Sequence, residues 1–224
     1  VTEEQFGWRI SENCPNTVKI IDTEDLHFLR EARRKAFIEK RNIGKGDLVK
    51  EIFVREIASI LRCDLYLIIS EFEYDLLIND FKINQNMLFY IPFLTESFEK
   101  SETPFEDRKH FVSIGNFLHE PNWQTVLKLK QIWKSIRKKL PEAELHIYGA
   151  YTSQKVLELH NEKDGFLVKG RANSAKHIFD KAKVLLAPIP FGAGLKGKLW
   201  ESMMFGLPNV TSSIGAEAMH KDLP

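Results

Sequence analysis

The sequence predicts an α/β protein built on parallel β-sheets and divided into two halves. Short apolar segments, typical of buried strands, alternate along the chain with amphipathic segments of helical length. Parallel strands need long crossover connections, usually helices, so this alternation favours parallel sheets covered by helices on both faces. The polar segment 95–109 contains Pro104 and shows no period. We interpret it as a linker between a first domain, 1–94, and a second domain, 110–224.

The first half offers three strands and three helices. Apolar runs predict strands at 18–21, 65–69 and 87–92, and helical patterns predict helices at 24–40, 48–61 and 71–81. The glycines of 44–46 break the first helical pattern. Ser70 followed by Glu73 is a capping-box pattern, which places the start of the third helix at Glu71.

The second half continues the same alternation. Its strands are expected at 111–115, 145–148, 166–168, 184–187 and 210–213, and its helices at 123–140, 153–160, 174–182 and 195–205. His119, Glu120 and Asn122 are expected in the loop before the first of these helices, with Asn122 as an N-cap candidate. Gly206 followed by Pro208 is typical of a helix C-terminus.

The composition limits the functions that the chain can have. With 224 residues, 43% of them hydrophobic, it can bury one or two cores. Lys and Arg number 32 against 31 Asp and Glu, so nucleic acid is not expected as a partner and any basic site is local. Cys14 and Cys63 show no metal-site spacing and fit a reducing compartment. No apolar run approaches a membrane span, and the first residues do not resemble a signal peptide. We therefore expect a cytoplasmic protein, and contact with a membrane surface stays open.

The segment 188–208, PIPFGAGLKGKLWESMMFGLP, directly follows an apolar strand. Gly192 and Gly194 allow the backbone to approach a ligand closely, and a helix starting near residue 195 directs its positive end to the same place. Lys196 and Lys198 add charge suited to a diphosphate, and Glu201 offers two acceptors suited to ribose hydroxyls. An ordinary tight loop followed by a solvated helix is the alternative.

Weaker candidates stand at the ends of other strands. Arg171 follows the strand at 166–168, where ligands of α/β proteins gather, although a plain surface arginine fits equally well. Asp22, Asp25 and His27, with Glu24, follow the first strand. They are candidates for a part of the site that faces the cleft between the two domains. Acidic residues in a first helical turn are also ordinary.

Three segments, 65–80, 112–150 and above all 186–219, resemble the large family of retaining glycosyltransferases called family 4 or glycosyl transferases group 1. The resemblance implies the GT-B architecture of two Rossmann-like domains and transfer of a sugar from a nucleotide-diphosphate donor to an acceptor hydroxyl. Glu201 matches the second glutamate of the family's E-x7-E motif, which holds the ribose. Gly115 and Asn116 fall in the loop after the first strand of the nucleotide-sugar-binding domain. The implied partners are a nucleotide sugar and a sugar, glycan or lipid-linked acceptor, with no cofactor and no metal.

The chain departs from the family pattern at two positions. Ala193 replaces the first glutamate of the motif, and Asn116 stands where many members have an arginine for the diphosphate, a charge that Lys196 or Lys198 could supply. Three strands before residue 95 and an end soon after residue 217 indicate that both domains are incomplete, so a partner chain could supply the missing parts. A non-catalytic nucleotide-sugar-binding or partner subunit is the main alternative function, and a GT-B sugar epimerase is a weaker one.

Overall fold

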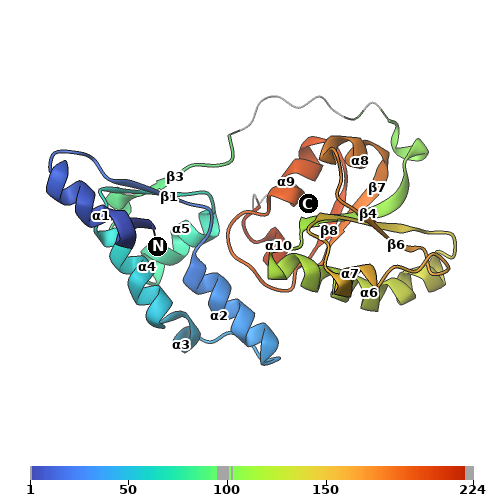
Figure 1. Cartoon of the computed structure of the whole chain (residues 1–224), viewed down its shortest axis with the longest axis horizontal. Helices are drawn as coiled ribbons and strands as arrows, with labels where there is room; N and C mark the ends of the chain where they lie inside the picture. The colour runs from blue at the N-terminus through green and yellow to red at the C-terminus, as the bar shows by residue number, and fades with distance from the viewer. Residues whose placement is uncertain (1, 95–100, 102, 220–224) are drawn as a thin grey trace. The chain divides into compact units, whose positions relative to one another are not determined.

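The structure, a computed structural model, describes residues 2–94, 101 and 103–219. It contains two compact units, each with one parallel β-sheet and its own helices (Figure 1). The first unit comprises residues 2–94, 191–195 and 217–219, and the second comprises 101, 103–190 and 196–216. The predicted fold class, α/β with parallel sheets, is therefore confirmed. Residues 95–100 and 102 of the predicted linker lie outside the described residues, and Phe105–Asp107 forms a short 3-10 helix.

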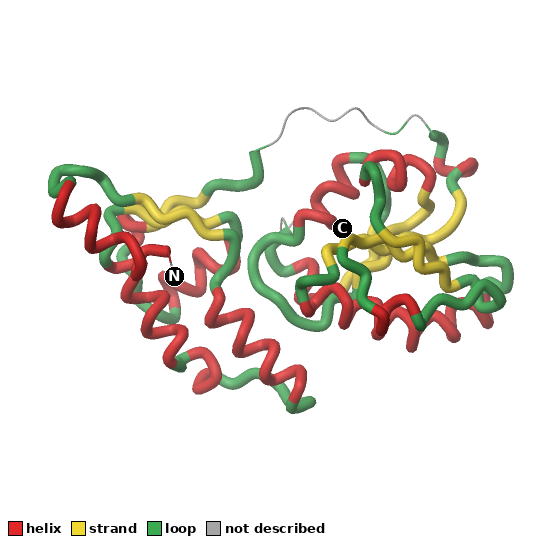
Figure 2. Tube along the Cα trace, in the orientation of Figure 1, coloured by secondary structure: helices red, strands yellow, loops and turns green. Residues whose placement is uncertain are grey.

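The sheet of the first unit has the strand order β1-β2-β3, and both strand pairs are parallel. Its strands are β1 (Ile20–Thr23), β2 (Leu65–Ile68) and β3 (Leu88–Tyr90). Its helices are α1 (Thr2–Asn13), α2 (His27–Ile38), α3 (Lys45–Leu48), α4 (Glu51–Leu61) and α5 (Glu71–Asn79), with a 3-10 turn at Gln85–Met87. The sequence patterns predicted the three strands but not α1. Helices α2, α4 and α5 gather on one side of the sheet (Figure 2).

The core of the first unit lies between this sheet and these helices. Tyr66 and Ile68 of β2 are almost fully buried against Leu77 of α5. Phe28 of α2 packs edge to face on Phe53, with ring centroids 5.0 Å apart. Apolar burial of this kind stabilises helices whose own propensity is modest.

The sheet of the second unit has the order β6-β5-β4-β7-β8, with all strands parallel. Its strands are β4 (Lys109–Asn116), β5 (Leu145–Ala150), β6 (Phe166–Gly170), β7 (Ala182–Ala187) and β8 (Asn209–Thr211). The chain adds β5 and β6 on one side of β4 and then returns to place β7 on the other side. The order thus reverses between β4 and β7. Doubly wound sheets bind ligands at such a switch point, outside the carboxyl ends of the strands.

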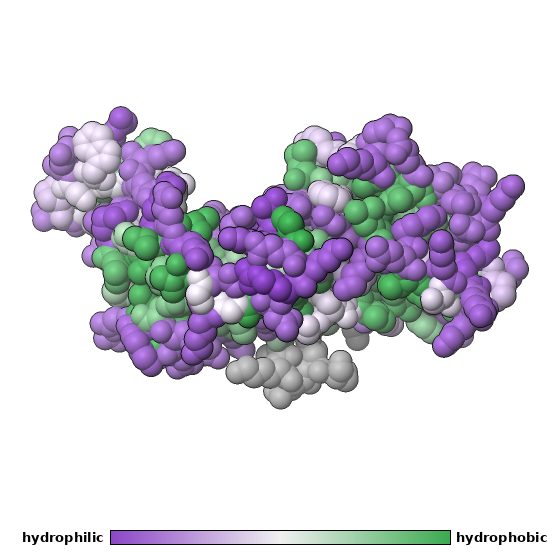
Figure 3. All heavy atoms as spheres, turned by 90° about the horizontal axis from the view of Figure 1, so that it is seen from below, coloured by the Kyte–Doolittle hydropathy of each residue, from purple (hydrophilic) through white to green (hydrophobic). Residues whose placement is uncertain are grey.

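The helices of the second unit are α6 (Glu120–Lys139), α7 (Gln154–Leu157), α8 (Ala175–Lys181), α9 (Gly197–Met204) and α10 (Ser213–Ala216). Helix α6 buries Leu129 and Trp133, and the Trp133 indole donates a hydrogen bond of 2.7 Å to the Asp164 carbonyl. None of the helices in the described ranges is long and apolar enough to cross a membrane. The face drawn in Figure 3 is mainly hydrophilic, with hydrophobic areas on each unit.

Two helix starts differ from the sequence predictions. Helix α6 begins at Glu120 with His119 as its N-cap, so Glu120 and Asn122 lie in its first turn, and Asn122 is not the N-cap. The Asn122 side chain instead forms hydrogen bonds with Asn116 and Lys198. Helix α9 begins at Gly197 rather than near residue 195, because 191–195 packs within the first unit.

The predicted N-terminus of α5 and the predicted C-terminus of α9 have the expected geometry. The Ser70 hydroxyl accepts a hydrogen bond of 3.3 Å from the Glu73 N–H at the start of α5. After α9, Gly206 has φ 66°, and the N–H groups of Gly206 and Leu207 donate to the carbonyls of Met203 and Ser202. This is the paired bonding of a Schellman cap, which glycine permits because it tolerates a left-handed conformation.

Candidate functional site

The candidate site lies at the switch point of the second sheet, where β4 ends at Gly115 and Asn116. The Asn116 side-chain oxygen accepts a hydrogen bond of 3.0 Å from the Leu118 N–H and so shapes the loop that follows β4. The Asn122 amide nitrogen donates a hydrogen bond of 2.8 Å to the Asn116 carbonyl. A Cβ atom at residue 115 would lie 2.8 Å from Cγ of Asn122, so glycine is needed there for Asn122 to pack against the strand.

Asn122 also connects this loop to helix α9. Its side-chain oxygen accepts a hydrogen bond of 2.6 Å from Nζ of Lys198. One amide therefore joins the end of β4 to the first turn of α9, across the point where the strand order reverses. Sequence reasoning treated Asn122 as a cap, and only its position at the start of the helix that follows β4 could have suggested this role.

Lys198 is a half-buried cation. Burial, and secondarily the charge of Lys196, lower the pKa of its ammonium group to about 8. Within the described part of the chain, no carboxylate forms an ion pair with Lys198. Lys196 is the N-cap residue of α9, where the helix adds its own partial positive charge. The switch point therefore concentrates positive charge that a bound anion would stabilise.

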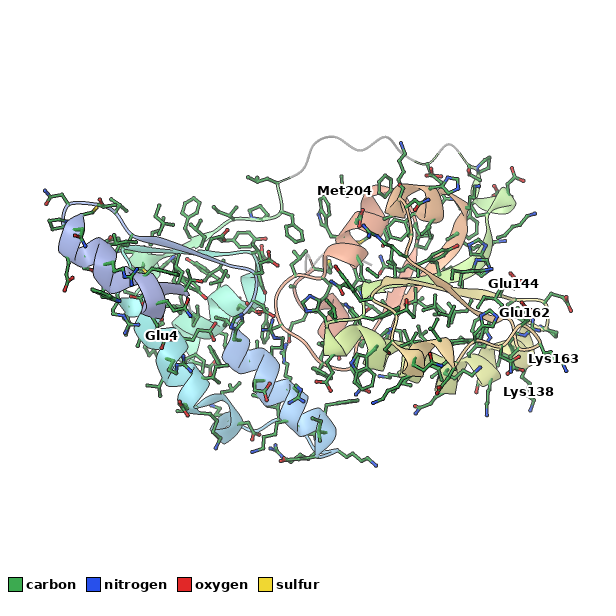
Figure 4. The ribbon with its side chains drawn as sticks, in the orientation of Figure 1. Glu4, Lys138, Glu144, Glu162, Lys163 and Met204 are labelled. Carbon is green, nitrogen blue, oxygen red and sulfur yellow. The ribbon has the colours of Figure 1, made fainter. Side chains whose placement is uncertain are left out.

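Glu201 lies in α9, one turn beyond Lys198. It is half-buried, and burial raises the pKa of its carboxyl group. Helix α9 ends at Met204, which Figure 4 labels. Glu201 and the two lysines thus share one short helix that starts at the switch point.

Arg171 is exposed directly after β6, which is an edge strand of this sheet. Neighbouring strands lie about 4.8 Å apart, so β6 is roughly 10 Å from β4. The structure therefore places Arg171 at the carboxyl end of its strand, as predicted, but two strands away from the switch point.

Gly192 and Gly194 belong to the segment Phe191–Leu195 of the first unit. Gly194 has φ 66°, and its N–H donates a hydrogen bond of 2.5 Å to the carboxylate of Glu73. A Cβ atom at residue 194 would collide with the Glu24 carbonyl. The structure thus shows a close approach of this backbone to Glu24 and Glu73. The predicted close approach to a ligand stays a prediction.

Two further contacts hold the same segment. The second carboxylate oxygen of Glu73, a residue only 2% exposed, accepts a hydrogen bond of 3.1 Å from the Leu26 N–H. The Arg33 guanidinium donates to the Gly192 carbonyl at 2.8 Å and forms a two-bond ion pair with Glu217. Sequence reasoning missed Arg33 and gave Glu73 only a capping role, because Gly192 and Gly194 lie more than a hundred residues away from them along the chain.

The acidic cluster after β1 is engaged in local contacts. Asp25 pairs with Arg30 at 2.5 Å and lies 3.6 Å from Nε2 of His27, while Asp22 is exposed on β1. The His27 side chain is exposed, and its backbone N–H donates to Glu56 at 3.0 Å.

Glu56 is a buried carboxylate that the sequence did not single out. It accepts hydrogen bonds from the N–H groups of His27 and Phe28 and so satisfies the first turn of α2. Burial raises the pKa of its carboxyl group, while these two hydrogen bonds act in the opposite direction. In the described ranges, no group of three His, Cys, Asp or Glu residues is placed to hold a metal ion.

Two parallel α/β units, the second with a Rossmann strand order and a cationic switch point, define a fold of the GT-B glycosyltransferase class. The sequence model of the family described as glycosyl transferases group 1 matches residues 108–222, and the chain belongs to this family. No curated protein sequence matches the chain.

Solved structures with a similar fold include three glycosyltransferases. TarM of S. aureus, in a complex that includes UDP, is 15% identical at a TM-score of 0.69, and the match covers 94% of this chain and 40% of TarM. The pneumococcal O-GlcNAc transferase GtfA, in complex with UDP and GlcNAc, gives 16% identity, a TM-score of 0.66, and coverage of 96% and 42%. WaaG, which is involved in lipopolysaccharide biosynthesis, gives 13% identity, a TM-score of 0.58, and coverage of 97% and 65%. This chain therefore spans less than half the length of TarM and GtfA.

Proposed function

We propose that this chain carries the nucleotide-sugar site of a retaining glycosyltransferase, which transfers a sugar from a nucleotide-diphosphate donor to the hydroxyl of a sugar, glycan or lipid-linked acceptor. The observation that supports it most is the position of Lys198, a half-buried cation without a carboxylate partner among the described residues, at the switch point of the second sheet. This lysine lies within the residues that match the family. The UDP in the TarM and GtfA complexes supports the same class of donor.

The chemistry of the proposed reaction follows from charge. As the bond between the sugar and the diphosphate breaks, negative charge grows on the departing phosphate oxygens. Lys196, Lys198 and the N-terminus of α9 would stabilise that charge, because fixed positive groups in a poorly solvated site are already oriented toward it. Glu201, one turn further along, would accept hydrogen bonds from the ribose hydroxyls.

One observation favours a second candidate, a subunit that binds a nucleotide sugar without turning it over. Ala193 stands where the family has a glutamate that contacts the donor sugar, and it is only 9% exposed, within an apolar cluster that includes Leu26 and Ile68. No carboxylate is available from this position. A partner chain would then be needed for catalysis, and the similar GtfA/B complex, at a TM-score of 0.61, supports that arrangement.

The proposal also places the protein in the cytoplasm. Cys14 and Cys63 are both free thiols, which is compatible with a reducing compartment.

Calorimetric titration with UDP, GDP and ADP tests the binding site. We expect at least one of them to bind the parent chain, and we expect Lys198→Met to weaken that binding about tenfold or more, because a charge-assisted contact is lost. Lys181→Met, an exposed position on α8, is the matched control and should bind as the parent does. No binding of any nucleoside diphosphate at millimolar concentration to well-folded protein would overturn the proposal. Hydrolysis of the matching nucleotide sugar separates the two candidates, because the second requires binding without turnover.

A further inference from the structure

A cavity lies at the edge of the same sheet that is opposite the switch point. It has a volume of about 990 Å³, and its lining includes residues at the amino ends of three strands, namely Lys109 of β4, Glu144 before β5 and Lys183 of β7. Because the strands are parallel, their amino ends form the edge opposite the switch point. The six residues of β5 separate the two edges by about 20 Å at 3.3 Å per residue. Figure 4 labels Glu144 at this edge.

Two stacked imidazoles line the cavity. The rings of His110 and His146 lie with centroids 3.8 Å apart and an interplanar angle of 15°. Burial lowers the pKa of both rings, that of His110 to about 4, and the charge of Lys169 acts in the same direction on both. Both shifts favour the neutral form of the imidazole.

The contacts of His146 fix which of its nitrogens carries hydrogen. Its Nε2 atom lies 2.8 Å from the Glu144 carboxylate, which can only accept, so Nε2 is the donor. Nδ1 is then a bare acceptor. It is buried and has no hydrogen-bond partner among the described residues. A buried acceptor without a donor is unfavourable, and a molecule in the cavity cannot reach this atom without a shift of the surrounding side chains.

Three lysines border this cavity, and none of them forms an ion pair with another described residue. Lys109 and Lys139 are exposed, and the Lys183 ammonium lies 5.4 Å from the centroid of the Phe105 ring. The apolar part of the lining is Phe111, Leu140, Pro141 and Ala143. Arg108 adds a further cation, and Glu142 and Glu144 are the two carboxylates of the lining. The surrounding unit is basic as a whole, since its described residues, 101, 103–190 and 196–216, contain 17 Lys and Arg against 10 Asp and Glu. The near-neutral charge of the full sequence hides this excess.

We propose that the cavity is a second ligand site, which binds a small organic anion: a phosphate or carboxylate on an aromatic or aliphatic body. The lysines would bind the anionic group, and the apolar side chains and the stacked imidazoles would cover the body. The volume is that of a typical small-molecule site. This site is separate from the proposed nucleotide-sugar site and does not depend on it.

The test uses 1-naphthyl phosphate as the probe, with the full chain, and follows the imidazole proton resonances of His110 and His146 by NMR. We expect saturable shifts of both resonances and a higher pKa of His110 in the complex, because a nearby anion favours the imidazolium form. The triple variant Lys109→Ala, Lys139→Ala, Lys183→Ala should bind at least tenfold more weakly. The control triple variant Lys128→Ala, Lys134→Ala, Lys138→Ala removes the same charge from exposed positions of α6 and should bind as the parent does.

Two analogues separate the parts of the proposed ligand. Inorganic phosphate lacks the apolar body and 1-naphthol lacks the charge, so each should bind more weakly than the probe. Absence of saturable binding at millimolar concentration, or equal loss of affinity in the two triple variants, would overturn the proposal. UDP titrated into the first triple variant should bind as it does to the parent, which keeps this result distinct from that for the proposed function.

Discussion

Affinity for a nucleoside diphosphate should fall as the pH rises through about 8, because Lys198 loses its proton there. Burial, with the charge of Lys196 as the second cause, sets the pKa of Lys198 to about 8 in the free protein. A bound diphosphate favours the charged ammonium and should return that pKa toward its ordinary value of about 10.4. Between these two values, binding must be accompanied by proton uptake, so affinity decreases with rising pH.

The magnitude follows from the two pKa values. At pH 7 nearly all of Lys198 is already charged, whereas at pH 9 only about a tenth of it is charged in the free protein. Affinity should therefore be about tenfold lower at pH 9 than at pH 7.

The same pKa shift of Lys198 also predicts how the stability of the unliganded protein depends on pH. The pKa of Lys198 is lower in the folded protein than in the unfolded chain, so above pH 8 the unfolded chain binds more protons than the folded protein. The free energy of unfolding should therefore rise between about pH 8 and pH 10.

Calorimetric titration of UDP at pH 7, 8 and 9, in buffers of different ionisation enthalpy, measures both affinity and proton uptake. Lys198→Met should bind more weakly at pH 7 and show no tenfold fall by pH 9. Lys196→Met should move the fall to higher pH, because the charge that helps to depress the pKa of Lys198 is removed. A parent protein whose UDP affinity is the same at pH 7 and pH 9, with no proton uptake, would refute the reasoning.

Three further predictions concern single side chains. Replacement of Glu201 with Ala should weaken nucleotide binding about tenfold to a hundredfold and abolish the preference for ribose over 2′-deoxyribose, because charge-assisted hydrogen bonds of about 1.5–3 kcal/mol are lost. Calorimetric titration of the ribose and 2′-deoxyribose nucleotides into the parent and the variant measures this loss. Equal affinities in parent and variant would leave Glu201 as a solvated helix residue. Gly206→Ala should lower the free energy of unfolding by about 1–2 kcal/mol, since φ is 66° and the space around it is open, whereas Gly194→Ala, at the same φ, should cost more because its Cβ meets the Glu24 carbonyl. Urea unfolding compares these two variants, and equal losses would contradict the close approach at Gly194. Leu129→Ala, at a position with 0% exposure, should cost about 2–5 kcal/mol in the same assay, and a loss below 1 kcal/mol would be incompatible with the packing of α6.

Local patterns were sufficient to predict the fold class and most of its elements. The second sheet was predicted strand by strand, because each strand is an apolar run between turn residues. Helix α1 was missed for a physical reason. Its side chains Glu3 and Glu4 form ion pairs with Arg62 and Arg55 of distant segments, and no pattern within residues 2–13 reveals them.

The candidate site was predictable only in part for the same reason. The Gly-x-Gly-x-Lys-Gly-Lys pattern indicated a cationic helix start, which is present at Lys196 and Lys198. It also indicated a close approach of the backbone to a ligand, which stays a prediction. The pattern could not indicate that Gly194 meets Glu73, which is 121 residues earlier in the chain. Nor could it indicate that Lys198 and Asn122, 76 residues apart, share a hydrogen bond. These partners are set by the order of the strands rather than by neighbouring residues.

The reversal of strand order in the second unit also has a consequence for how quickly its sheet can form. Strands β4, β5 and β6 follow one another along the chain, whereas β7 returns to β4 from far along the sequence, so that Phe111 pairs with Val184. Closing this longer loop costs more conformational entropy and slows the pairing. We expect the β4–β5 pair to form first in refolding and β7 to join it afterwards. Ile147→Val should then slow refolding, while Leu185→Ala should mainly accelerate unfolding. Stopped-flow kinetics measures both rates for the two variants. If β7 pairs first, Leu185→Ala would instead slow refolding and Ile147→Val would mainly accelerate unfolding.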